Sequence, residues 1–155
     1  MPERSTRLGI LVGVDGSSCS KTAVRWAAAE AAIHRVPLTV VHVLHTPDAG
    51  WSGWGLSTAP MPADFSERQQ EYARQVIADA IATIGQNTGD KPPLHIAGEV
   101  LLSPVIPTLV DLAKDAQMIV VGSRGMHGVR RFVQSSVPNA VSHAARRNVL
   151  IVATD

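Results

Sequence analysis

Cysteine is almost absent from this sequence, whose 155 residues include only one, Cys19. A single cysteine cannot form an intramolecular disulfide, so the fold must be held together by its core. An excess of charge of one sign is also missing, because the formal net charge is only +1. Such a balance creates no strong field to attract nucleic acid or an anionic membrane, and we expect neither as a partner.

Long hydrophobic runs are missing too. No apolar stretch approaches the ~20 residues that a membrane-spanning helix needs, and the polar segment 1–7 lacks the apolar core of a signal peptide. We expect 1–7 to be a flexible tail and the protein to be cytoplasmic. The remaining composition, 45% hydrophobic and 17% charged, is that of a globular protein. The length fits one domain, which we assign to residues 1–155.

Strands and helices alternate along the chain. Apolar, β-branched runs predict strands of a buried parallel sheet over Leu8–Val14, Leu38–Leu44, Leu94–Val100, Met118–Val121 and Val149–Val152. Helical spacing predicts helices over Ser18–Arg35, Asp64–Ile84, Ser103–Ala116 and Ser136–Ala145. Pro37 should stop the first helix, and Gly85 should cap the second. This order predicts an α/β fold with a five-stranded, doubly wound parallel sheet, in which the less uniform run Leu94–Val100 is an edge strand.

Residues 45–63 interrupt the alternation. They show no periodicity, are rich in glycine and proline, and include Trp51 and Trp54. A structureless segment of this length is uncommon in a compact domain and is usually a spacer, a lid or a binding loop. The sequence leaves two interpretations open, a mobile spacer and a lid or partner-docking loop.

The turn after the first predicted strand is the first candidate for a binding site, because ligands of such sheets lie at the carboxyl ends of the strands. It has the sequence Gly13-Val14-Asp15-Gly16-Ser17. The carboxylate of Asp15 could accept hydrogen bonds from an adenine amino group or a ribose hydroxyl. The alternative is an aspartate that only orders the turn.

The loop after Val121 is the second candidate, and it begins Gly122-Ser123-Arg124-Gly125-Met126-His127-Gly128. Glycines allow successive N–H groups to turn inward and cradle an anion. Ser135-Ser136-Val137 stand at the predicted start of the last helix, where N–H groups and the helix dipole favour phosphate. The two parts could hold a triphosphate together; the alternative is a glycine-rich turn with a serine cap. Because the loop should face solvent, we expect side chains introduced at Gly122 or Gly125 to block phosphate without disturbing the fold.

Two common nucleotide motifs are missing. No Gly-x-x-x-x-Gly-Lys-Ser/Thr sequence is present, which excludes a P-loop NTPase. No Gly-x-Gly-x-x-Gly follows the first strand, which argues against a dinucleotide-binding Rossmann site.

Together the two candidate segments resemble the motifs of the universal stress protein family. Its first motif matches Gly13–Ser17, and its second matches Gly122, Gly125, the nine residues 126–134, and then Ser135-Ser136. The likeness runs from Leu8 to Val152, and 105–128 is also similar to the N-terminal half of the tandem universal stress proteins of actinobacteria. The resemblance implies a Rossmann-like fold of the adenine nucleotide α-hydrolase-like group, with strand order 3-2-1-4-5.

The resemblance also implies a ligand, ATP with or without Mg²⁺, and its site. Gly13, Val14 and Asp15 would meet the adenine and ribose, and Val41 would pack against the adenine. Val121 and Gly122 would border the base or ribose, and Gly125 the phosphates. The phosphates and ribose would be held by Ser135, Ser136 and Val137, and the same loop also contains Ser123, Arg124, Met126, His127 and Gly128. Ser135 replaces the family's last motif glycine; at a positive φ a serine would cost on the order of 1 kcal/mol, whereas its hydroxyl could donate a hydrogen bond.

Three functions from different classes fit such a fold. The leading hypothesis is an ATP-binding regulatory or stress-response protein with little or no hydrolysis, because no carboxylate pair suggests a magnesium site and no base for activating water is evident. The alternative is a slow ATPase or another nucleotide-transforming enzyme of the α-hydrolase-like group. A phospho-accepting receiver domain is disfavoured, because the third predicted strand offers only Glu99 and the segment Val149–Asp155 has no lysine.

The last predicted strand suggests how the protein assembles. Val149–Val152 is apolar and has no proline or lysine that would protect an exposed edge from pairing. Family resemblance implies that such strands pair about a two-fold axis. We therefore expect a homodimer whose isologous interface is centred on Leu150 and Ile151. The alternative is a monomer whose edge is covered by the Trp51–Trp54 loop or the N-terminal tail.

Overall fold

The computed structural model describes residues 8–44, 63–87, 95–102, 105–122 and 148–152. Within these ranges the elements follow the order β1 (Gly9–Gly13), α1 (Ser18–His34), β2 (Leu38–Leu44), α2 (Ala63–Asn87), β3 (Ile96–Leu102), α3 (Val105–Ala113), β4 (Ala116–Gly122) and β5 (Asn148–Val152). The long segment after β2 and the last predicted helix, Ser136–Ala145, lie outside the described residues.

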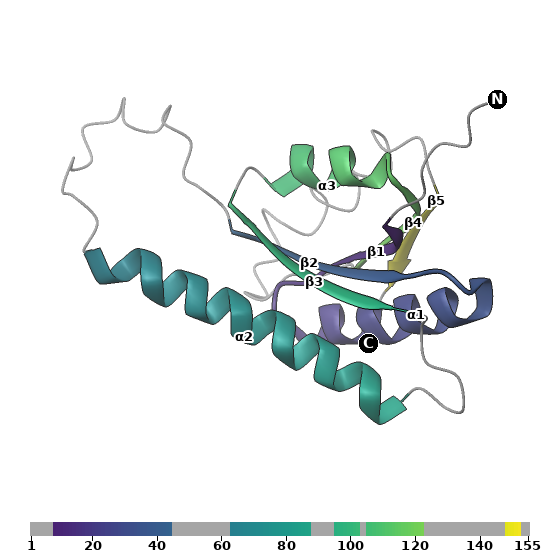
Figure 1. The fold of residues 1–155 in the computed structure, drawn as a ribbon, viewed down its shortest axis with the longest axis horizontal. Coiled ribbons are helices and arrows are strands. Elements are labelled where there is room, and N and C mark those ends of the chain that lie inside the picture. Colours follow the sequence, from purple (N-terminus) through teal and green to yellow (C-terminus); the bar gives the residue numbers. More distant parts are fainter. Residues whose placement is uncertain (1–7, 45–62, 88–94, 103–104, 123–147, 153–155) are drawn as a thin grey trace.

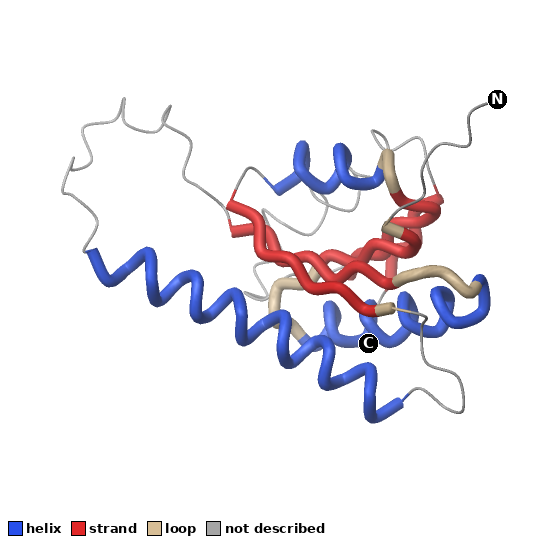
Figure 2. The backbone as a smooth tube through the Cα atoms, viewed as in Figure 1, coloured by secondary structure: helices blue, strands red, loops and turns tan. Residues whose placement is uncertain are grey.

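The strands form one five-stranded parallel sheet in the order β3-β2-β1-β4-β5. Helices α1 and α2 cover one face and α3 lies on the other, as Figures 1 and 2 show. The prediction of a doubly wound sheet with order 3-2-1-4-5 is therefore confirmed. So is the edge position of the strand predicted at Leu94–Val100, because β3 and β5 are the outer strands of this sheet.

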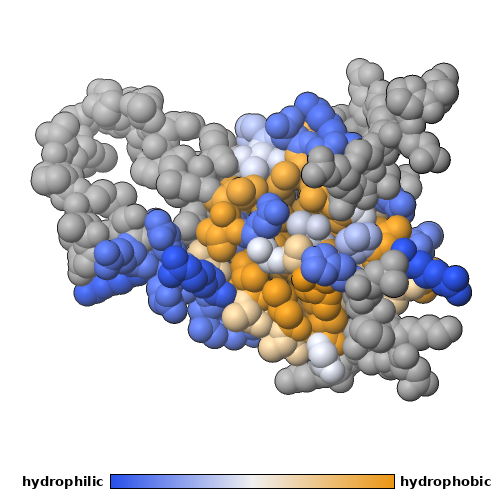
Figure 3. Space-filling model, in the orientation of Figure 1, coloured by the Kyte–Doolittle hydropathy of each residue, from blue (hydrophilic) through white to orange (hydrophobic). Residues whose placement is uncertain are grey.

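The sheet is buried on both faces at its centre, as the uninterrupted apolar runs predicted. In β1, Ile10 and Val12 belong to the core beneath α1 and α2, whereas Leu11 belongs to the core beneath α3. The small residues of α1 let its backbone approach the sheet closely, and Ala23 and Ala27 are 0% exposed. Figure 3 shows hydrophobic residues gathered over the sheet and bordered by the hydrophilic residues of α2.

Several boundaries differ from the sequence-based prediction. Helix α1 is capped by Ser17, whose Oγ accepts a hydrogen bond from the Ser20 N–H, and it ends before Arg35, which adopts the left-handed conformation with φ 55°. Thus a left-handed cap ends the helix before Pro37 is reached. Gly85 is not the cap of α2, because the helix continues to Asn87. A glycine costs a helix only ~1 kcal/mol, and the neighbouring Ile84, 2% exposed, holds this last turn in the core.

The third and fourth predicted strands and the third predicted helix are also shifted. Strand β3 begins at Ile96 and continues to Leu102, and each of its residues is paired with β2, from Leu38↔Ile96 to Leu44↔Leu102. Helix α3 ends at Ala113, and Ala116, expected in that helix, begins β4. The ends of β3 and the start of β4 are therefore set by pairing with neighbouring strands, which a pattern within one segment cannot reveal.

Candidate functional site

The turn after β1 is fixed by its own side chains. Asp15 Oδ1 accepts a hydrogen bond from the Ser17 N–H at 2.9 Å, so the carboxylate orders the turn, as one interpretation of the sequence held. Gly16 has φ +87°, a conformation that glycine adopts without strain. Ser17 then begins helix α1 as its N-cap. The candidate carboxylate is thus held at the carboxyl end of the central strand.

Strand β2 holds the base of this turn at Val14. The Val14 N–H donates to the Val41 carbonyl oxygen at 2.9 Å. The Val14 carbonyl oxygen lies 2.7 Å from Nδ1 of His42, which must be the protonated nitrogen because a carbonyl can only accept. His42 is 7% exposed, and the ring of Tyr72 from α2 meets it edge-on with centroids 6.3 Å apart.

The end of β4 lies beside this turn, because β1 and β4 pair in the register Val12↔Val120. Val121 is 4% exposed, and Gly122 is half-buried. A Cβ on Gly122 would lie 3.0 Å from Cys19 Sγ and 3.2 Å from the Cys19 carbonyl carbon. This glycine packs against the first turn of α1, which argues against the expectation that Gly122 could be replaced without disturbing the fold.

Val41 lies level with Gly13 in the sheet, one strand away. Its side chain is 1% exposed and belongs to the core beneath α3, together with Leu11 and Val121. Val43 lies on the same face nearer the carboxyl end of β2 and is only half-buried, so it is the more accessible of the two valines. Strand alternation places both valines on one face, and they differ in exposure because Val43 lies nearer the carboxyl end of the strand.

The structure thus brings six of the expected site residues together toward the carboxyl ends of the adjacent strands β2, β1 and β4: Gly13, Val14, Asp15, Val41, Val121 and Gly122. The remaining expected residues lie outside the described part of the chain: Ser123, Arg124, Gly125, Met126, His127, Gly128, Ser135, Ser136 and Val137. Their grouping with the turn stays a prediction.

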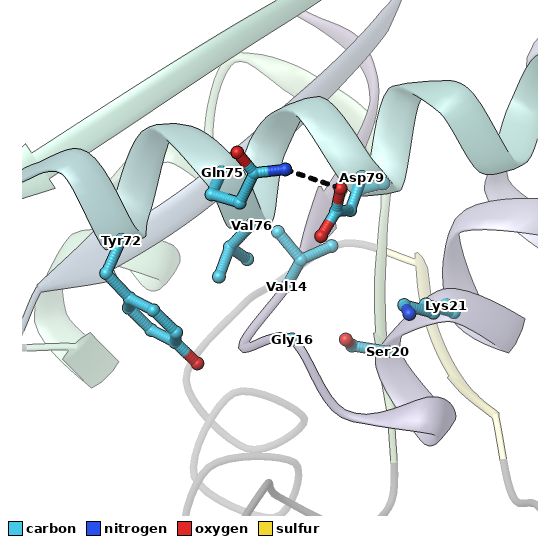
Figure 4. Close-up of a pocket in the computed structure, with 9 residues that line it drawn as sticks. Val14, Gly16, Ser20, Lys21, Tyr72, Gln75, Val76 and Asp79 are labelled. Carbon is cyan, nitrogen blue, oxygen red and sulfur yellow. Dashed lines mark hydrogen bonds between the residues drawn. The ribbon is translucent and has the colours of Figure 1, made fainter.

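A pocket of about 210 Å³ opens between the β1–α1 turn and α2 (Figure 4). Its walls are formed by Val14, Gly16, Ser20, Lys21, Tyr72, Gln75, Val76, Asp79 and Ala80. At its rim the Gln75 side-chain amide donates to Asp79 Oδ1 at 2.8 Å. The pocket residues from α2 were not predicted from the sequence. The spacing of Tyr72, Gln75 and Asp79 places three polar groups on one helix face, and this pattern could have indicated them.

The described residues contain no group of three or more His, Cys, Asp or Glu side chains that could hold a metal ion. No helix among them is both long and apolar enough to cross a membrane.

In sequence, this chain is similar to the members of one protein family. The model of the universal stress protein family matches residues 9–153. A universal stress protein of Mycolicibacterium smegmatis is 37% identical over 155 residues, which are 100% of this chain and 51% of that protein. The chain therefore spans about half the length of the curated relatives it matches.

Solved structures share the fold. A universal stress protein in complex with cAMP superposes with a TM-score of 0.67 at 22% identity, covering 97% of this chain and 100% of that one. The universal stress protein of Archaeoglobus fulgidus in complex with dAMP gives a TM-score of 0.57 at 26% identity, covering 94% of this chain and 97% of that one.

Proposed function

The chain belongs to the universal stress protein family, and on that premise we propose that it binds an adenine nucleotide, ATP in particular, as a regulatory protein with little or no hydrolysis. The observation that carries the proposal is the position of the Asp15 turn. It lies at the carboxyl end of the central strand, beside the end of β4, where ligands of doubly wound sheets bind. Solved family members in complex with cAMP and dAMP support the choice of an adenine nucleotide.

In this proposal Gly13, Val14 and Asp15 meet the base and ribose, and the β4 end meets the sugar. The phosphates are assigned to Gly125 and to the segment 135–137. The pocket beside α2 has a volume of about 210 Å³ and is smaller than typical ligand sites, which measure ~300–1,000 Å³. We therefore place the nucleotide over the turn and the strand ends, with the pocket at its side.

We further propose that the protein acts in the cytoplasm as a homodimer through β5. Ile151 is 44% exposed on this outer strand, and its neighbour Leu150 is half-buried. Exposed apolar edges are paired or covered in natural proteins. A second copy of the domain would provide the pairing strand. Within the dimer, nucleotide occupancy would set the surface offered to a regulatory partner.

The decisive experiment measures which nucleotide the purified protein carries. Mass spectrometry of the supernatant after heat denaturation should detect an adenine nucleotide, and ATP added to emptied protein should raise its melting temperature. At a hundred times the dissociation constant the expected stabilisation is roughly 2.7 kcal/mol. The same titration with ADP, AMP and cAMP ranks the ligands. No bound nucleotide and no shift with any of them at millimolar concentration would refute the proposal.

A further inference from the structure

Strand β1 is flanked at each end by a carbonyl group that bonds to a side chain of β2. At the amino end, the Leu8 carbonyl oxygen accepts a hydrogen bond from Thr39 Oγ1 at 2.9 Å. At the carboxyl end, the Val14 carbonyl oxygen accepts one from His42 Nδ1 at 2.7 Å. The two bonds are of the same kind, but only the second adjoins the turn that carries Asp15.

The bond from His42 fixes the peptide group between Val14 and Asp15. A trans peptide is planar, and its N–H points opposite to its carbonyl. Holding the Val14 carbonyl toward His42 therefore also sets the direction of the Asp15 N–H and the starting point of its side chain. The Val14 N–H is held as well, by the Val41 carbonyl oxygen, so both backbone polar groups of Val14 are constrained.

The bond is also protected from water. His42 is 7% exposed, and the ring of Tyr72 stands against it at an interplanar angle of 75°. A hydrogen bond inside a protein is electrostatically stronger than one in water, and losing its donor leaves a buried carbonyl unsatisfied. Because β2 is paired with both β1 and β3, the imidazole stands on a rigid support.

We propose that His42 is a positioning residue of the nucleotide site: it holds the Val14–Asp15 peptide in the orientation that the ligand meets. This inference rests on the proposed function, because it assigns the purpose of the bond to the Asp15 turn. His42 does not touch the nucleotide. Its contribution is to preorganise the turn, so that binding does not have to order it.

The test compares His42→Leu with the matched control Thr39→Val, which removes the equivalent bond at the other end of β1. Both variants should lower the melting temperature, because His42→Leu leaves a buried carbonyl without its donor and Thr39→Val a part-buried one. Only His42→Leu should weaken ATP binding measured by calorimetry, by about tenfold, which corresponds to ~1.4 kcal/mol. His42→Gln keeps an N–H donor on the side chain and should recover part of the affinity.

A second measurement is independent of the ligand. The Ser17 N–H is bonded to Asp15 Oδ1, so its hydrogen exchange reports the order of the turn. Exchange should be faster in His42→Leu than in the parent and unchanged in Thr39→Val. Equal ATP affinities of parent, His42→Leu and Thr39→Val, or equal losses in both variants, would overturn the inference while leaving the proposed function standing. A parent that binds no nucleotide, with the exchange difference still present, would refute the proposed function and reduce His42 to a support of the turn.

Discussion

Gly122, the last residue of β4, packs directly against Cys19 in the first turn of α1. A Cβ added to Gly122 would lie 3.0 Å from Cys19 Sγ, and 3.3 Å from the Cys19 carbonyl oxygen. Cys19 cannot easily give way, because it is 2% exposed and its thiol donates to the Val152 carbonyl oxygen at 3.3 Å. The first glycine of the second family motif therefore has a packing role in addition to any role at the ligand.

This contact predicts that Gly122→Ala is destabilising. The added methyl group must displace the Cys19 side chain and backbone, and overpacking of this kind typically costs ~1–3 kcal/mol. Gly13→Ala is the matched control at the end of the adjacent strand, since a Cβ there would meet Leu109 Cδ2 at an ordinary 3.6 Å. Chemical denaturation should show a clear loss for the first variant and almost none for the second. Equal stabilities would contradict the packing role.

A second prediction concerns two glycines in different conformations. Gly16 has φ +87°, so Gly16→Ala should lower the free energy of unfolding by ~1–2 kcal/mol. Gly85 lies inside α2, with no heavy atom within 4 Å of an added Cβ, so Gly85→Ala should raise it by up to about 1 kcal/mol. Thermal unfolding of both variants beside the parent checks the opposite signs. A Gly16→Ala variant as stable as the parent would show that the turn is not held in this conformation, and a loss in Gly85→Ala would contradict the helical position of Gly85.

The phosphate assignment is tested at Gly125, because Gly122 variants would confound binding with stability. Gly125→Val should abolish ATP binding by filling the space that the phosphates need. Ser135→Gly, which restores the family's glycine, should leave the affinity unchanged or improve it. Calorimetric titration decides both. Wild-type affinity in Gly125→Val would mean that the phosphates lie elsewhere, and a large loss in Ser135→Gly would identify the hydroxyl as a ligand.

The rate of ATP hydrolysis distinguishes a nucleotide-binding regulatory protein from a nucleotide-transforming enzyme. We expect ATP hydrolysis on the order of one turnover per minute or less, far below the typical enzyme rate of ~10 per second. A coupled assay for released phosphate measures it. A steady rate above ~1 per second that disappears in Asp15→Ala would instead support a nucleotide-transforming enzyme.

The proposed dimer gives a prediction about mass. Light scattering at micromolar concentration should give twice the chain mass of 16.4 kDa, and Ile151→Lys should return the protein to a monomer. Ile33→Lys is the control, because Ile33 is 71% exposed and belongs to α1, a helix that covers a face of the sheet. A monomeric parent would exclude the dimer. Dissociation by both variants would show a general loss of solubility.

The strands and helices were predicted well because the patterns that indicate them lie within single segments of the sequence. A β-branched apolar run such as Met118–Val121 is typical of a strand buried on both faces, and the alternation of such runs with helices indicates a parallel sheet. The order of the strands is different: it came from the resemblance to a family, since periodicity within a strand says nothing about its neighbours. Strand ends such as that of β3 depend on the same neighbours and were misplaced.

The candidate site was predicted in part for the same reason. A glycine-rich turn after a strand is visible in the sequence, so Asp15 could be named at once. The contact of Val14 with His42 joins residues 28 positions apart, and that of Cys19 with Val152 joins residues 133 apart. No pattern within one segment reveals such pairs. His42, Tyr72 and the packing role of Gly122 became visible only when the sheet brought their elements together.

The central strand of the sheet precedes the other four described strands in the sequence, and this order matters while the protein is being synthesised. As β1, β2 and β3 leave the ribosome they can pair with one another, but the other edge of β1 must wait for β4. Until then Ile10, Leu11 and Val12, all at most 1% exposed in the finished fold, border an open edge. Such pairing between distant segments is slow and exposes the chain to aggregation. A nascent chain that stops before β4 therefore presents a strand that is buried in the finished fold with one side uncovered, which is the kind of surface that chaperones bind.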